Sequence, residues 1–176
     1  PKYHFFDGDE QKNSPYSKFA QKECPDELDL VIVAFYQHFL NFNDFKKLYD
    51  LHKVPFIFWM MDMAVFTGGC HYSWDCEGYK KKCGNCPALL SSKQNDLSNK
   101  NLVFKNFVLG QIKAYAIAIS RHQMEQAKKS TVLSNLPIYQ LYHAIDLQRY
   151  IPVKDKSALN KKLKISTYSF NLFFIS

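Results

Sequence analysis

The chain has 176 residues, of which 47% are hydrophobic and 16% aromatic, so it can bury the core of one ordinary domain. This composition excludes an intrinsically disordered chain. The formal net charge of +7 favours anionic partners such as nucleic acid, lipid headgroups or a phosphorylated substrate, although lysines scattered over a solvated surface would give the same charge.

Two long apolar stretches, 28–40 and 54–66, contain polar residues and fall short of the roughly 20 residues that span a bilayer. We therefore expect neither a transmembrane helix nor a signal peptide. The last residues, 170–176, are mostly apolar and indicate a strand that is just beginning. An exposed apolar strand is a poor terminus because its free edge invites aggregation, so we expect the chain to be a fragment of a longer protein.

Apolar runs and helical periodicities alternate from residue 28 onwards, which predicts an α/β fold with a Rossmann-like parallel sheet flanked by helices. The first run is almost entirely apolar and is expected to be a strand buried on both faces. The expected strands are 28–35, 55–60, 115–119, 138–141 and a last one from 170; the expected helices are 16–22, 43–52, 96–110, 121–129 and 155–164.

Helix ends and buried faces are also predicted. Asn43 is a plausible N-cap for the helix 43–52, and either Asp96 or Ser98 could cap the helix 96–110. Its buried face is expected to hold Val103, Phe107 and Val108.

The long loop 61–95 is inserted after the second predicted strand and carries four of the five cysteines, as Cys70-x5-Cys76-x6-Cys83-x2-Cys86. Four thiolates at this density could form a tetrahedral structural zinc site, and His71 could replace one of them. Two alternatives remain: two disulfides in an oxidising compartment, or four free thiols. Cys24 stands alone and is expected to be a packed thiol.

Thr67, Gly68 and Gly69 follow shortly after the end of a predicted strand, where parallel sheets bind ligands. Paired glycines allow the backbone to approach a sugar or phosphate, although most such pairs are only turns. Asp62 lies at the same strand end and could bind a sugar hydroxyl, act in acid–base chemistry, or only cap nearby amides. His143 and Asp146 follow the fourth predicted strand, where they could face an interdomain cleft or pack in a hinge.

Residues 61–87, MDMAVFTGGCHYSWDCEGYKKKCGNCP, resemble the signature loop of a subgroup of retaining GT-B glycosyltransferases, the group 1 or family 4-like enzymes. That loop typically reads His-Asp-Met-x-x-Phe-Thr-Gly-x-Cys-x-Tyr, then spaced cysteines, then Cys-Gly-x-Cys-Pro. Later segments keep the family order, and 96–98 resembles the usual link into the next helix. In 118–130 a strand leads through Ser120 into a helix, and 142–146 resembles the segment before the second domain. The resemblance covers roughly residues 28–176.

The resemblance implies two Rossmann-like domains across a cleft, the first binding the acceptor and the second a nucleotide-sugar donor. Residues 1–150 are then the acceptor-side domain, and 151–176 are the linker, helix and first strand of the donor domain. The implied reaction transfers a glycosyl group from a nucleotide-diphosphate sugar to a saccharide or lipid-linked acceptor, in bacterial surface polysaccharide biosynthesis. No catalytic metal is expected, and zinc would be structural.

The family also implies a location and a set of site residues. A cytoplasmic enzyme is expected, with peripheral contact at the inner membrane face through basic residues, and without a nucleic-acid partner. The candidate residues are Asp62 for catalysis and Thr67, Gly68, Gly69, His71, Ser120 and His143 for substrate binding. The candidate zinc ligands Cys70, Cys76, Cys83 and Cys86 come from the cysteine spacing and not from the family.

Several positions depart from the family pattern. Met61 stands where the family has a histidine, whose hydrogen bonds methionine cannot make, and Tyr142 replaces a proline. Without a donor domain this fragment is not expected to catalyse transfer by itself. Two alternatives stay open. One is an inactive truncated relative. The other is a zinc-stabilised basic module for nucleic acid, with bases bound by Lys80–Lys82 and by the aromatic residues Tyr72, Trp74 and Tyr79.

Overall fold

The computed structural model describes residues 2–152 and 154–166. The chain divides into two compact units between Tyr142 and His143, whereas the sequence placed a domain boundary after residue 150. The second unit contains one described helix, α5 (Lys156–Leu163), which begins at the N-cap Asp155. The strand predicted from residue 170 lies outside the described residues.

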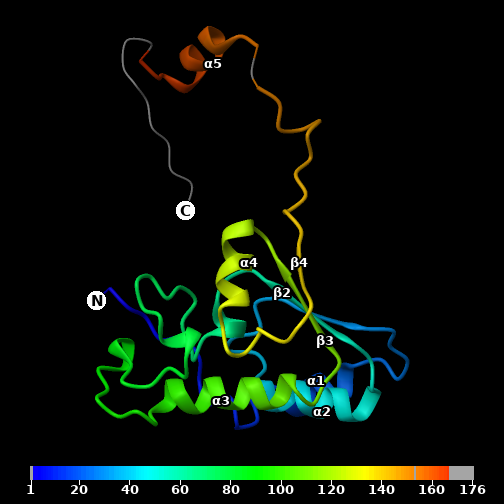
Figure 1. Cartoon of the computed structure of the whole chain (residues 1–176). Coiled ribbons are helices and arrows are strands. Elements are labelled where there is room, and N and C mark those ends of the chain that lie inside the picture. Colours follow the sequence, from blue (N-terminus) through cyan, green and yellow to red (C-terminus); the bar gives the residue numbers. More distant parts are fainter. Residues whose placement is uncertain (1, 153, 167–176) are drawn as a thin grey trace. The chain divides into compact units, whose positions relative to one another are not determined.

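The first unit is an α/β structure with four parallel strands flanked by helices, which confirms the predicted fold class and is consistent with a Rossmann-like fold (Figure 1). The strands pair in chain order, β1-β2-β3-β4. Helix α2 packs against α3, and α4 packs against β3 and β4. The elements are α1 (Ser17–Glu23), β1 (Val31–Val33), α2 (Phe42–His52), β2 (Phe56–Met60), three 3-10 turns (Ala64–Phe66, Gly78–Lys80 and Pro87–Leu89), α3 (Leu97–Leu109), β3 (Ala114–Ala118), α4 (Arg121–Lys128) and β4 (Ile138–Gln140).

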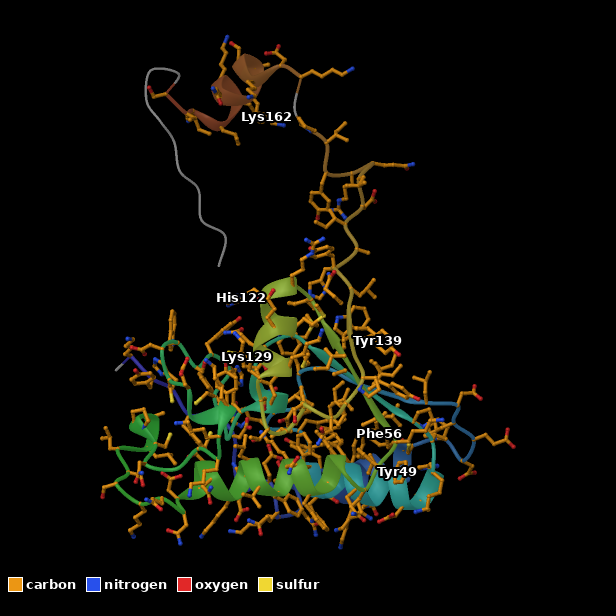
Figure 2. All side chains as sticks on the ribbon, in the orientation of Figure 1. Tyr49, Phe56, His122, Lys129, Tyr139 and Lys162 are labelled. Atoms are coloured by element: carbon orange, nitrogen blue, oxygen red, sulfur yellow. The ribbon has the colours of Figure 1, made fainter. Side chains whose placement is uncertain are left out.

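The register of β2 against β3 explains how large side chains fit into the core. Each large buried residue of β2 stands beside an alanine of β3, in the pairs Phe56–Ala114, Phe58–Ala116 and Met60–Ala118. The small alanine side chains leave space that aromatic residues of α2 can occupy. Large residues thus stand beside small ones, as close packing requires. The ring of Phe42 stacks on Phe58 with centroids 5.6 Å apart, and Tyr49 meets Phe56 edge-on at 6.3 Å (Figure 2).

The opposite face of the sheet is less covered. Residues that alternate with the buried ones, such as Ile57 and Ile117, are only half-buried. On β1, the edge strand of the described sheet, Ile32 is 56% exposed. The prediction that the first strand is buried on both faces is therefore wrong. Successive side chains of a strand point to opposite faces of the sheet, so an edge strand with one open face buries only every second side chain.

Of the two predicted N-caps, Asp96 is confirmed and Asn43 is wrong. Helix α2 begins after Asn41, not Asn43, because the Asp44 carboxylate accepts the N–H of Asn41 at 2.9 Å and closes a capping box. Asn43 instead donates to the side chain of Asn13 at 2.8 Å. Asp96 caps α3 as predicted, accepting from the N–H of Asn99 at 3.2 Å.

The buried face of α3 differs from the prediction. Val108 is buried, but Val103 and Phe107 are exposed. The face that is buried instead carries Ser98, Asn101, Leu102, Lys105, Val108 and Leu109. It meets the N-terminal segment and the loop after β2, whose polar groups bind its polar side chains, so the apolar pattern of α3 alone pointed to the wrong face.

Candidate functional site

A buried ion network lies beneath the loop that follows β2. Lys105 of α3 has no accessible surface, and its Nζ donates to Asp7 Oδ2 at 2.6 Å and to the carbonyl oxygens of Ala64 and Thr67 at 2.8 and 3.1 Å. Glu10 Oε1 lies 3.3 Å from the same Nζ. One lysine thus connects the N-terminal segment, the loop and α3.

Asn101, one turn before Lys105, makes a second set of connections. Its amide donates to the carbonyl oxygens of Gly8 and Gly68 at 2.8 and 3.1 Å, and its Oδ1 accepts the N–H of Glu10 at 3.1 Å. Asn101 is fully buried, and all of these partners are backbone groups. Hydrogen bonds from side chains of α3 therefore fix the position of the loop 64–69.

Glu10 makes this network sensitive to pH. Burial raises the pKa of Glu10 to about 7, against an ordinary value of 4.5, although the charge of Lys105 opposes the rise. Between these two values the folded chain holds more protons at Glu10 than the unfolded chain does. The contribution of Glu10 to the free energy of unfolding therefore falls as the pH rises from about 4.5 to about 7.

We expect the Glu10→Gln variant to lose this pH dependence. The free energy of unfolding of the variant minus that of the unaltered chain should increase by on the order of 3 kcal/mol from about pH 4.5 to about pH 7.5. This follows because each unit of pKa shift corresponds to about 1.4 kcal/mol. Urea unfolding across this pH range measures the effect. Glu125→Gln, which removes an exposed carboxylate on α4, is the matched control, and equal pH profiles for both variants would exclude Glu10 as the source.

The glycines of the loop serve close packing. A Cβ on Gly68 would lie 2.2 Å from the carbonyl oxygen of Ser98, and one on Gly69 would lie 2.3 Å from the ring of Phe5. Thr67 is buried, and its hydroxyl donates to the carbonyl oxygen of Cys70 at 2.7 Å. These three residues shape the loop from inside, and their role in substrate binding stays a prediction.

Asp62 is the carboxylate at the end of β2. Its side chain is only 8% exposed, and its Oδ1 accepts the N–H of Ala64 at 2.8 Å. Its Oδ2 lies 3.4 Å from Nδ1 of His71 and has no hydrogen-bond partner within the part of the chain that the structure describes. Burial raises the pKa of Asp62, while the Ala64 N–H and His71 hold it down. His71 in turn packs on the ring of Phe6, with centroids 4.2 Å apart.

A cavity of about 580 Å³ opens beyond the carboxyl ends of β2 and β3. The loop after β2 forms one wall of this cavity, and the start of α4 forms the other. Its lining residues are Lys2, Met61, Met63, Tyr72, Trp74, Asp75, Ile119, Ser120, His122, Gln123 and Gln126. A smaller cavity of about 220 Å³ shares four of these residues and adds, among others, Lys80 and Lys129 (Figure 2 labels His122 on α4 and Lys129 directly after it). The volume of the larger cavity is in the range of ligand sites.

Trp74 has an unusual conformation at the rim of the cavity. Its φ is 51°, in the left-handed region, although it is a large residue and not glycine. It is also 65% exposed, and its ring lies 6.5 Å from that of Tyr72, which is exposed as well. The left-handed backbone and the exposed indole, together at the rim of a cavity, make Trp74 a candidate ligand-binding residue.

Gln123 joins the two strand ends that form the cavity. Its Nε2 donates to the carbonyl oxygen of Asp62 at 2.9 Å, and its Oε1 accepts the N–H of Ile119 at 3.0 Å. Ser120, the N-cap of α4, accepts the N–H of Gln123 at 3.1 Å and lines the cavity. The sequence had singled out Ser120 but not Gln123. The spacing of Gln123 and Gln126, on one face of the helix after a strand end, was the available signal.

The four cysteines of the loop lie near one another, and all five cysteines of the chain are free thiols. Burial raises the pKa of Cys70 to about 12 and that of Cys83 to about 11, and the other thiols nearby add to the rise. Cys24 packs against the core, as predicted. Within residues 2–152 and 154–166, no three His, Cys, Asp or Glu side chains are arranged to hold a metal ion.

The predicted site residues are distributed over both units. Ser120 lines the cavity, whereas Asp62, after the end of β2, and its neighbour His71 are not among the lining residues. His143 is exposed in the second unit, and its role stays a prediction. Each helix of the described chain is too short or too polar to cross a bilayer.

Comparison with known proteins gives no match. No family model fits the chain, and no curated protein or solved structure is significantly similar to it.

Proposed function

We propose that the chain is the acceptor-side part of a retaining glycosyltransferase and that the cavity beyond β2 and β3 binds the acceptor saccharide. The observation that carries this proposal is the position of the cavity, at the carboxyl ends of parallel strands, with two exposed aromatic rings on its wall. The wall belongs to the same loop that resembles the signature of these enzymes. A domain that holds the nucleotide-diphosphate sugar completes the enzyme.

The lining of the cavity suits a sugar. The C–H faces of a pyranose ring pack on aromatic faces, which carry negative charge density, and Tyr72 and Trp74 offer two such faces. Hydroxyl groups need donors and acceptors, which Ser120, His122 and Gln126 provide across the cavity. Asp62 is the candidate acid–base residue of the proposal, since its Oδ2 is unpaired within the described residues and its chain neighbours Met61 and Met63 line the cavity.

The remaining expectations fit the same proposal. Lys129 beside the smaller cavity favours an acceptor that carries phosphate, such as a lipid-linked saccharide at the inner face of a membrane, whereas Lys80 is already paired with Glu77. The proposed enzyme then works in the cytoplasm, in the biosynthesis of surface polysaccharide. Met61 lines the cavity where relatives have histidine, so it contributes apolar contact and no hydrogen bond.

Trp74→Gly is the variant that tests the cavity. Glycine relieves the left-handed backbone at this position, so we expect the free energy of unfolding to rise by about 1 kcal/mol. Saccharide binding should weaken at least about tenfold, equivalent to about 1.4 kcal/mol, because the exposed stacking surface is lost. Saturation-transfer NMR with methyl glycosides of glucose, galactose and N-acetylglucosamine measures binding, and urea unfolding measures stability.

Phe107→Ala is the matched control, since it removes an exposed aromatic ring of α3 that does not line this cavity. It should leave saccharide binding unchanged. If the unaltered chain binds none of these glycosides, or if both variants bind them equally well, the proposed acceptor site is wrong.

A further inference from the structure

The four thiols of the loop 61–95 converge on one region. Cys76, Cys83 and Cys86 all lie within electrostatic range of Cys70, and Cys83 lies within range of Cys76 and Cys86. The Sγ atoms of Cys76 and Cys83 are each 3.6 Å from the point where a Cβ on Gly78 would stand. The backbone has thus gathered four soft donors without joining them in disulfides.

The turn that carries Cys83 and Cys86 is strained. Cys83, Gly84 and Asn85 all have positive φ values, of 51°, 88° and 46°, and only the middle residue is a glycine. Each left-handed residue other than glycine costs about 1–2 kcal/mol. A Cβ on Gly84 would meet the carbonyl oxygen of Gln94 at 2.0 Å, so this residue can only be a glycine. Such a turn persists only where its surroundings determine it.

Hydrogen bonds with neighbouring residues hold this turn, at the sulfur of Cys83 and at backbone N–H groups. The N–H of Gly68 donates to the sulfur of Cys83. The N–H of Cys86 donates to Asp96 at 2.9 Å, and the N–H of Gly84 donates to Ser98 at 3.0 Å. The turn that carries Cys83 and Cys86 is therefore fixed to the N-terminal end of α3.

We infer that Cys70, Cys76, Cys83 and Cys86 bind one structural Zn²⁺ ion as a four-thiolate site. No three of these side chains in the described chain already have the geometry of a metal site, so binding requires the thiols to turn towards a common centre. The four thiols release four protons, and the site then carries a net charge of −2. Lys81 and Lys82, exposed immediately before Cys83, offset this charge. Soft thiolate ligands select zinc over magnesium or calcium.

The site would stiffen the cavity wall. Cys76 follows Trp74 and Asp75 and lines the smaller cavity, so an ion bound to Cys76 restrains the segment that carries the exposed indole. This inference does not depend on the proposed function, because the metal content is measured without any saccharide.

Metal analysis of the full chain tests the site. The protein is purified with a reductant and without chelators, and its zinc content is measured by plasma mass spectrometry. We expect one zinc ion per chain, released by a mercurial reagent that blocks thiols. Replacement by Co²⁺ should give the thiolate-to-cobalt charge-transfer absorption of a tetrahedral sulfur site. Cys86→Ser should lower the zinc content at least about tenfold, whereas the control Cys24→Ser, at a packed thiol outside the loop, should retain it.

Three results would overturn the inference. The first is well under one equivalent of zinc with all thiols reactive. The second is an intact mass lower by four hydrogens, which indicates two disulfides. The third is zinc that stays bound in Cys86→Ser or is lost in Cys24→Ser. Should Cys86→Ser fail to fold, the cobalt spectrum of the unaltered chain decides, and the absence of the charge-transfer band rejects the site.

Discussion

Lys105→Met is expected to destabilise the first unit by about 3–5 kcal/mol, which is the usual cost of removing one partner from a buried ion pair. Methionine fills a similar volume but leaves Asp7 and Glu10 buried without a positive charge, and it leaves two carbonyl oxygens of the loop without their donor. Urea unfolding at pH 7, followed by circular dichroism, measures the loss as a lower midpoint.

Lys100→Met is the matched control, because Lys100 is exposed on the same helix. It should change stability by no more than about 0.5 kcal/mol. A second comparison adds Asp7→Asn and Glu10→Gln to Lys105→Met. Removing the buried negative charges together with the lysine should recover part of the loss. A loss below about 1 kcal/mol in Lys105→Met would show that the network is hydrated rather than buried.

Gly68→Ala is expected to cost about 3 kcal/mol, at the upper end of overpacking effects. The added Cβ would stand 2.2 Å from the carbonyl oxygen of Ser98 and 2.8 Å from its carbonyl carbon. These are backbone atoms in the first turn of α3 and cannot rotate away as a side chain can. Relief therefore requires the loop and the helix to separate, which also lengthens the hydrogen bond from Asn101 to the carbonyl of Gly68.

Gly110→Ala provides the control for this substitution. Gly110 ends α3 in a right-handed conformation, and the nearest atoms to its added Cβ lie at an ordinary 3.5 Å. Alanine there should be neutral or stabilising by up to about 1 kcal/mol, because it restricts the unfolded chain. Unfolding midpoints of the two variants are compared directly. Equal midpoints would mean that the loop moves freely away from α3.

The sequence was sufficient to predict an α/β fold with a parallel sheet, because most strands lie in short apolar runs and most helices follow a cap. Residues 55–60 and 115–119 were placed as strands within one residue of β2 and β3. The buried face of α3 was mispredicted because Lys105 and Asn101 have side chains that usually face solvent. Their partners Asp7 and Gly8 lie more than ninety residues away in the chain, and no local pattern indicates such a pairing.

The candidate site was predicted only in part, for a similar reason. Asp62 and Ser120 mark strand ends, so topology alone places them near one edge of the sheet. The exposed, left-handed conformation of Trp74 depends on how the loop is folded, which spacing does not determine. Gln123 joins Asp62 to Ile119 only once β2 and β3 are paired.

The buried connections of the loop determine what a ligand would meet. Because Lys105 and Asn101 hold the carbonyl groups of residues 64, 67 and 68 in the interior, the segment behind the cavity is preorganised. A ligand does not have to immobilise this segment, so the conformational entropy lost on association would come from exposed side chains of the lining, such as Tyr72, Trp74 and His122. Ligand selectivity at the cavity would then depend on the fixed backbone of the loop and on the two exposed rings of Tyr72 and Trp74, which can reorient.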